Sequence, residues 1–210
     1  QYLGSASYDG SWRLWDIPTR KELLLQEGHC REVFALKFQD DGALAASGGL
    51  DGVACVWDLR SGRQILAMEG HAKEIYGLDW SPNGYHIATA SADNTIRILD
   101  LRKRQHLYTI PAHKSVVSDV KFYHGDHRLP LEPSGSNGDG DRDMEIERGR
   151  EIDGGESAPT VPGLYLASSS YDGTVKIWSA DTWKLVKSLP GHEGKVMSLD
   201  ISQGKPIMQP

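Results

Sequence analysis

The chain has 210 residues, of which 39% are hydrophobic; this content excludes a wholly disordered protein and is enough for an ordinary core. No apolar run approaches the roughly 20 residues that a membrane helix needs, and the N-terminal stretch QYLGSASYDG has no signal-peptide pattern, so we expect an intracellular protein with no membrane partner. The two cysteines, Cys30 and Cys55, are too few for a disulfide framework or a zinc site.

The net charge of −6 is concentrated in one segment. Residues 125–161 contain ten acidic residues and four arginines, and therefore carry the whole net charge. Because the rest of the chain is balanced, electrostatics does not exclude contact with RNA. The segment is also rich in glycine and proline, and we predict a disordered surface loop.

The first predicted strands, YLGSAS and SWRLWD, begin a pattern that returns along the chain. Two independent marks recur with steps of 42, 42 and 79 residues, and the excess of 37 in the last step is the length of the acidic segment. The first mark stands at Trp15, Trp57, Leu99 and Trp178, and the second at His29, His71, His113 and His192. The chain is therefore built from repeats.

Each repeat is predicted to form four strands. The repeat at residues 70–111, for example, contains the alternating runs EIYGLDW, YHIATAS, TIRILD and HLYTI, separated by the turn signals SPNG, ADN and LRKRQ. Asp-Gly or Asp-Asn stands between the second and third strands, where a tight hairpin needs residues that tolerate positive φ. No segment has a helical period.

A period of about 40 to 45 residues, with Gly-His early and Trp-Asp late, is typical of WD40 β-propeller blades. The chain resembles the WD40-repeat family, which implies an all-β fold of four-stranded sheets stacked around an axis. In the third strands, apolar residues are predicted to pack between blades, at Trp12, Val56, Ile98 and Ile177. The predicted divisions are the end of a blade at 1–27, repeats at 28–69, 70–111 and 112–190, the last containing the insert at 125–161, and the start of a further blade at 191–210.

About four blades are expected. The chain starts at a second strand and stops after the first strand KVMSLDIS, so its ends are predicted to lie inside blades. We favour an incomplete open arc from a seven-bladed parent, and the alternative is a closed four-bladed ring.

Ser, His and Asp recur together and invite a hydrolase interpretation. Catalytic groups converge once in one pocket, whereas these recur in every repeat, so we predict a buried hydrogen-bond relay within each blade. Its members are His29, Ser47, Asp51 and Trp57; His71, Thr89 and Asp93; and His113, Ser168, Asp172 and Trp178. There is no phosphate loop, nucleophile elbow or metal-ligand pattern, and we expect neither catalysis nor a cofactor.

Basic residues are concentrated in the predicted turns between third and fourth strands. Such a rim is a candidate site for a partner protein or for RNA phosphates, and the alternative is an ordinary solvated surface. We name as the basic rim Arg60, Arg63, Arg102, Lys103 and Arg104. The acidic segment is predicted to leave the sheet on the same side, where it would screen the rim or be a tolerated insertion.

The stretches REVFAL, GALAASGGLDG and KEIYG are more particular than generic WD40 marks. They resemble the family of WD-repeat subunits of the U4/U6 small nuclear ribonucleoprotein (snRNP), which are pre-mRNA splicing factors. The resemblance implies a nuclear scaffold of the U4/U6.U5 tri-snRNP that binds spliceosomal snRNP proteins near U4/U6 snRNA, with direct RNA contact left open. The alternative is a generic WD40 adaptor, such as a ubiquitin-ligase substrate receptor or a signalling scaffold.

Overall fold

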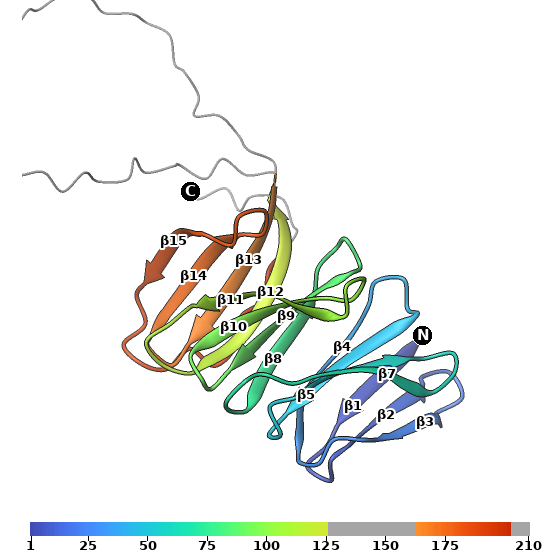
Figure 1. Ribbon diagram of the computed structural model, residues 1–210. Helices are drawn as coiled ribbons and strands as arrows, with labels where there is room; N and C mark the ends of the chain where they lie inside the picture. Colours follow the sequence, from blue (N-terminus) through green and yellow to red (C-terminus); the bar gives the residue numbers. More distant parts are fainter. Residues whose placement is uncertain (126–162, 203–210) are drawn as a thin grey trace, which may run out of the picture.

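The computed structural model describes residues 1–125 and 163–202, and every regular element in these two ranges is a β-strand (Figure 1). The strands form four antiparallel sheets, and strands that follow one another in sequence pair with one another in each sheet. Within the described residues no helix is long and apolar enough to cross a membrane. The acidic insert lies outside the described residues except for Gly125.

The first two sheets contain residues 2–68. Sheet 1 has three strands, β1 (Tyr2–Ala6), β2 (Ser11–Asp16) and β3 (Lys21–Glu27). Sheet 2 has four strands, β4 (Val33–Phe38), β5 (Leu44–Gly49), β6 (Ala54–Asp58) and β7 (Arg63–Met68).

The third and fourth sheets repeat the four-stranded order. Sheet 3 has β8 (Ile75–Trp80), β9 (His86–Ser91), β10 (Thr95–Asp100) and β11 (Gln105–Pro111). Sheet 4 has β12 (Val117–Gly125), β13 (Gly163–Ser170), β14 (Thr174–Ser179) and β15 (Leu185–Pro190).

The hairpins between second and third strands have the backbone geometry that the sequence predicts. One residue in each has positive φ, at 81°, 71°, 71° and 80°, and these residues are Gly10, Gly52, Asn94 and Gly173. Glycine and asparagine accept this conformation with little steric penalty, and their positions follow the same steps of 42, 42 and 79 residues. This prediction is confirmed.

Apolar residues form three buried clusters, and each cluster fills the space between two neighbouring sheets. Trp12 and Leu14 of sheet 1 meet Trp57 of sheet 2, and Val56 on the other face of sheet 2 meets Ile75 of sheet 3. The third cluster joins Ile96, Ile98 and Ile110 of sheet 3 to Val120, Leu166 and Trp178 of sheet 4. Each sheet therefore depends on its neighbour to exclude water from its faces.

The third-strand residues predicted to pack between sheets divide into two groups. Trp12, Val56 and Ile98 are fully buried. Ile177 is only half-buried, because in the described residues no further sheet covers that face of sheet 4.

The four sheets follow one another in an open arc, with sheet 1 and sheet 4 at opposite ends of the molecule (Figure 1). This arrangement confirms the all-β propeller architecture in its open form. The number of blades in a longer parent stays a prediction, as do the proposed repeat boundaries.

Residues 195–202 were predicted to form a first strand, and the structure assigns no strand there. Four hydrogen bonds join the segment to sheet 4. The Val196 N–H donates to the Ser170 carbonyl oxygen at 3.1 Å, and the Val196 carbonyl oxygen accepts from the Ser118 hydroxyl at 2.6 Å. The Asp119 carboxylate accepts from the Ser198 hydroxyl at 2.9 Å and from the Leu199 N–H at 3.4 Å. Of these four bonds only the one between Val196 and Ser170 joins two backbone groups, whereas a strand pairs with its partner through backbone hydrogen bonds along its length.

Candidate functional site

The predicted relay residues of sheet 2 lie in one chain of hydrogen bonds. The Trp57 indole N–H donates to Ser47 Oγ at 2.8 Å, and Ser47 Oγ lies 2.7 Å from His29 Nε2. His29 Nδ1 lies 2.7 Å from Asp51 Oδ2. Because an ionised carboxylate can only accept, Nδ1 carries a proton toward Asp51. In the neutral imidazole Nε2 then accepts from the Ser47 hydroxyl, which itself accepts from the indole.

Sheet 4 repeats this chain with the same atoms. Trp178 donates to Ser168 Oγ at 2.9 Å, Ser168 Oγ lies 2.8 Å from His113 Nε2, and His113 Nδ1 lies 3.0 Å from Asp172. The acidic insert separates two of these partners by 59 residues in sequence without disturbing the geometry.

Sheets 1 and 3 hold shortened versions. In sheet 3, His71 contacts Asp93 at 2.9 Å and Thr89 at 2.8 Å, while Leu99 occupies the indole position and packs in the core. In sheet 1 the indole of Trp15 donates to Ser5 at 2.8 Å.

Burial and hydrogen bonding set the charges in these relays. Burial lowers the pKa of His71 and of His113 below the ordinary histidine value, despite the neighbouring carboxylates. Burial acts to raise the pKa of Asp93, but hydrogen bonds from Thr95 and His71 outweigh it and bring the pKa to about 2. The pKa of Asp172 is lowered in the same way, against burial, mainly by Thr174 and the Lys114 N–H. The relays of sheets 3 and 4 therefore combine a neutral imidazole with an ionised carboxylate.

The relays are closed to substrates. The imidazole side chains are 1%, 3% and 0% exposed at His29, His71 and His113, and the hydroxyls of Ser47 and Ser168 lie in fully buried residues. A nucleophile must reach its substrate, and these hydroxyls are occupied and covered. Among the described residues there is also no cluster of three or more His, Cys, Asp or Glu side chains that would hold a metal ion.

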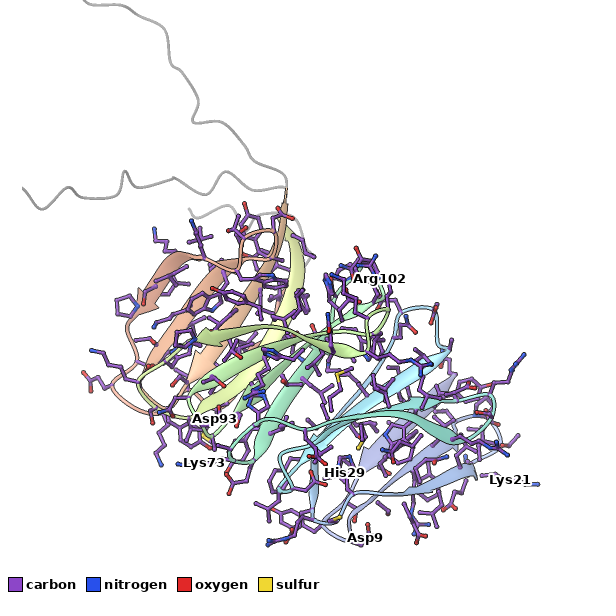
Figure 2. All side chains as sticks on the ribbon, in the orientation of Figure 1. Asp9, Lys21, His29, Lys73, Asp93 and Arg102 are labelled. Carbon is purple, nitrogen blue, oxygen red and sulfur yellow. The ribbon has the colours of Figure 1, made fainter. Side chains whose placement is uncertain are left out.

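The basic rim lies at the opposite end of the sheets from the relays. Figure 2 shows Arg102 and Lys21 on the far side from Asp9, His29 and Asp93. In sheet 2, Arg60 lies in the turn between β6 and β7 and Arg63 begins β7. In sheet 3, Arg102, Lys103 and Arg104 lie in the turn between β10 and β11. The rim residues therefore lie at the same end of two neighbouring sheets.

Arg102 differs from the other rim residues because it is engaged within its own sheet. Its guanidinium lies 3.6 Å from the centroid of the Tyr85 ring and 3.3 Å from the buried carboxylate of Asp100.

An exposed row of aromatic side chains crosses sheets 1, 2 and 3 at the relay end, and sequence analysis missed it. The rings of Tyr8 and Phe34 meet edge to face at 5.6 Å, and those of Phe34 and Tyr76 stack at 5.5 Å with an interplanar angle of 6°. Tyr8 is 79% exposed and Tyr76 is 38% exposed. We call Tyr8, Phe34 and Tyr76 the aromatic row.

The sequence contained a signal for this row. Phe34 and Tyr76 are 42 residues apart, and the Tyr-Asp-Gly of Tyr8 returns at Tyr171, where Lys195 lies 4.8 Å above the ring centroid. The three rings form one continuous surface because sheets 1, 2 and 3 pack side by side, and the spacing in the sequence does not by itself show this.

A groove of about 250 Å³ runs from the aromatic row down the innermost strands β4, β8 and β12. Its lining includes the side chains of Phe34, Tyr76 and Met197 together with Lys37 and Asp119. A groove that combines aromatic rings with charged side chains suits a protein segment better than a reaction centre.

One position of the inner strands alternates in charge with the repeat steps, at Lys37, Asp79, Lys121 and Asp200. Burial and the nearby Lys121 lower the pKa of Lys37, and burial raises the pKa of Asp79, whose carboxylate accepts the Phe122 N–H at 2.8 Å. Because the charges on the neighbouring strands β4, β8 and β12 alternate in sign, they largely cancel along these inner strands.

Comparison with known proteins agrees with this architecture. The family described as "WD domain, G-beta repeat" matches residues 20–58, 62–100 and 158–179. The chain is 48% identical over 204 residues, 96% of its length, to the U4/U6 small nuclear ribonucleoprotein PRP4 of Saccharomyces cerevisiae. It is 60% identical over 40 residues, 19% of its length, to a U4/U6 small nuclear ribonucleoprotein PRP4-like protein of Arabidopsis thaliana.

The matched parts cover 36% of the yeast relative and 7% of the Arabidopsis relative, so the chain spans well under two thirds of either. The repeated sheets, their buried relays and the family match together show that the chain carries WD40 repeats, arranged as an open arc of blades, and that its sequence is similar to the PRP4 proteins.

Proposed function

We propose that this chain is part of a nuclear, non-catalytic scaffold of the U4/U6 snRNP that mediates contacts between splicing proteins near the snRNA. The observation that carries the proposal is the 48% identity, over 96% of the chain, to a protein named U4/U6 small nuclear ribonucleoprotein PRP4. Participation in the U4/U6.U5 tri-snRNP belongs to the same proposal.

The geometry supports docking in preference to chemistry. The Ser, His and Asp sets are buried and recur in separate sheets, so each is occupied in holding its own blade together. The aromatic row is exposed and continuous across three blades, and aromatic side chains are frequent anchors of protein interfaces. The row and the groove beneath it are the proposed docking surface.

The test is affinity purification of the tagged chain from nuclear extract. We expect co-purification of U4/U6 snRNP proteins with U4 and U6 RNA, and loss of the proteins when Tyr8→Ala and Tyr76→Ala are combined. Tyr108→Ala is the matched control, because Tyr108 is 46% exposed but lies on the outer strand β11. Recovery of cullin-type ligase subunits without spliceosomal proteins would instead favour the generic adaptor.

The basic rim is proposed to contact phosphates of the snRNA. Each phosphate contact adds about one to the slope of log affinity against log salt. Combining Arg63→Ala, Lys103→Ala and Arg104→Ala should therefore reduce the salt dependence of binding to U4/U6 RNA. Lys73→Ala with Lys114→Ala, which removes exposed charge at the opposite end, should leave it unchanged. Equal slopes for both variants would show that the rim does not contact RNA.

A further inference from the structure

A cavity of about 670 Å³ opens between sheets 1 and 2 at the end that carries the basic rim. Its lining is mainly aliphatic and also includes one guanidinium, one carboxylate and the largely exposed phenol of Tyr2. Sheet 1 contributes Tyr2, Leu14, Leu23 and Leu24, and sheet 2 contributes Gly42, Ala43, Asp58, Leu59 and Arg60. Because Leu23 is 47% exposed, the cavity presents apolar surface to solvent.

The next gap along the arc shows how the chain fills such a space. Between sheets 2 and 3 the position of Ala43 is taken by Tyr85, and that of Arg60 by Arg102, each 42 residues later. The Tyr85 ring lies half-buried beneath the Arg102 guanidinium, with 3.6 Å between ring centroid and Cζ. The carboxylate of Asp100 then pairs with the same guanidinium at 3.3 Å.

The gap between sheets 1 and 2 lacks the ring. Ala43 supplies a single methyl group where Tyr85 supplies a phenol, and the space is left open. Asp58 stands 42 residues before Asp100, but its carboxylate accepts the Arg60 backbone N–H at 3.0 Å and the Ser61 hydroxyl at 2.7 Å. Within the described residues the exposed Arg60 guanidinium forms no ion pair and lies over no aromatic ring. The cavity thus has the apolar walls and the cation of its neighbour without the aromatic group between them.

We propose that this cavity docks a partner protein segment that presents an aromatic side chain next to an acidic residue. The ring occupies the place that Tyr85 fills one blade further on, between Leu24, Leu59 and the Arg60 guanidinium, and the acid pairs with Arg60. The chemistry of the occupant is inferred from the side chains that fill the equivalent gap between sheets 2 and 3. This site lies at the opposite end of the sheets from the aromatic row, and its existence does not depend on the proposed splicing role.

The test is a methyl NMR titration of the 210-residue chain, labelled at leucine, with the peptide acetyl-Asp-Tyr-Asp-amide. Saturable shifts are expected at Leu23, Leu24 and Leu59, and none at Leu185, which is 48% exposed on β15. Ala43→Tyr introduces the side chain that fills the neighbouring gap and should fill the cavity without unfolding the chain. The affinity for the peptide should fall at least about tenfold, equivalent to roughly 1.4 kcal/mol. Thermal unfolding of this variant checks that the fold is retained.

Tyr85→Ala provides the converse variant. Removing the ring should open a second cavity between sheets 2 and 3, so the peptide should now also shift the methyl signals of Leu44, Leu66 and Leu101. The peptides acetyl-Asp-Ala-Asp-amide and acetyl-Lys-Tyr-Lys-amide should bind at least about tenfold more weakly, because each lacks one of the two features.

Several results would overturn the proposal. Unchanged peptide affinity in folded Ala43→Tyr would place binding elsewhere, and equal affinity of the lysine peptide would remove the role of Arg60. Leucine shifts that depend on protein concentration without peptide would assign the cavity to a second copy of the chain. RNA binding that survives in Ala43→Tyr and is lost in Arg60→Ala, with no peptide binding in the unchanged chain, would assign Arg60 to phosphate instead.

Discussion

At the scale of single residues, the relay hydroxyls connect groups that could not otherwise be buried. Ser47 accepts from the Trp57 indole and donates to His29, and all three residues lie in the interior of sheet 2 or at its edge. A buried donor without an acceptor loses its solvation and gains nothing. The recurrence of the set in sheet 4, with the same atoms and similar distances, shows that each blade satisfies these groups independently.

Ser47→Ala should destabilise the chain by about 1 to 3 kcal/mol, because it leaves the Trp57 N–H and His29 Nε2 without their buried partner. Urea denaturation followed by circular dichroism measures the change. Ser188→Ala, on the exposed outer strand β15, is the matched control and should change stability by less than about 0.5 kcal/mol. Equal midpoints for the two variants would contradict a stabilising role for the relay.

The relays also predict a pH dependence of stability. The pKa values of His71 and His113 are lowered by burial, so the unfolded chain binds protons that the folded chain does not. Their contribution is present above the ordinary histidine pKa of 6.5 and is lost as pH falls below it. The lowered pKa of Asp93 acts in the same direction, between its ordinary value of 3.8 and about 2.

We therefore expect a lower urea midpoint at pH 5.5 than at pH 7.5. Combining His71→Gln with His113→Gln should reduce the difference between the two pH values, whereas His192→Gln, at an exposed histidine outside the relays, should preserve it. A midpoint that rises on acidification would show that the carboxylates, and not burial, dominate the histidine pKa values.

At the scale of elements, the turns between third and fourth strands share one unusual backbone position. The residue there has a φ of 58°, 65°, 53° or 56°, at Arg20, Gly62, Arg104 and Trp183. These positions follow the repeat steps, yet only one of them is glycine. A residue with a Cβ is strained at positive φ, so the three turns without glycine at this position carry backbone strain that the turn with Gly62 avoids.

Arg104→Gly should raise the free energy of unfolding by about 0.5 to 1 kcal/mol, because relief of the left-handed strain outweighs the added freedom of the unfolded chain. Lys103→Gly in the same turn is the control, since Lys103 has no positive φ and only the unfavourable entropy remains. Thermal unfolding should therefore move the two variants in opposite directions. If Arg104→Gly is destabilised, the contacts of the arginine side chain stabilise the fold by more than the strain of its positive φ destabilises it.

At the scale of the whole molecule, the arc is stabilised by apolar packing between neighbouring sheets. Each of the three apolar clusters lies between two sheets, and none lies within one sheet alone. Stability is therefore carried from blade to blade, as in other repeat proteins, and exposed surface is concentrated at the two ends and the rims.

Ile98→Ala, which removes a fully buried side chain from the cluster between sheets 3 and 4, should cost about 2 to 5 kcal/mol. Ile65→Ala makes the same change at a residue that is 47% exposed on β7 and should cost much less. Urea denaturation compares them. Similar losses for both would show that the gaps between sheets are not where the arc is stabilised.

Much of this architecture was predictable because it is periodic. The hairpin glycines, such as Gly52, and the spacing of His29, Ser47 and Asp51 depend only on the local order of strands and turns, which the sequence repeats. The segment 195–202 shows the limit of the same reasoning. It has the composition of a first strand, but a strand exists only beside a partner, and composition does not provide one.

The candidate surfaces were less accessible to prediction. Tyr8, Phe34 and Tyr76 belong to three different sheets, and their contact depends on how those sheets stack. The difference between Ala43 and Tyr85 is visible in the sequence, but its consequence is a cavity beside Arg60, and that consequence needs two sheets in place.

The sequence by itself determined the repeat, the β-strand content, the turns and the members of each relay, because these features follow from order and spacing within about 42 residues. Only the tertiary structure decided which side chains from separate repeats meet, where the arc exposes aromatic rings, and which gap between blades stays open. Such contacts depend on the distance and angle between sheets, and packing of many side chains sets both together.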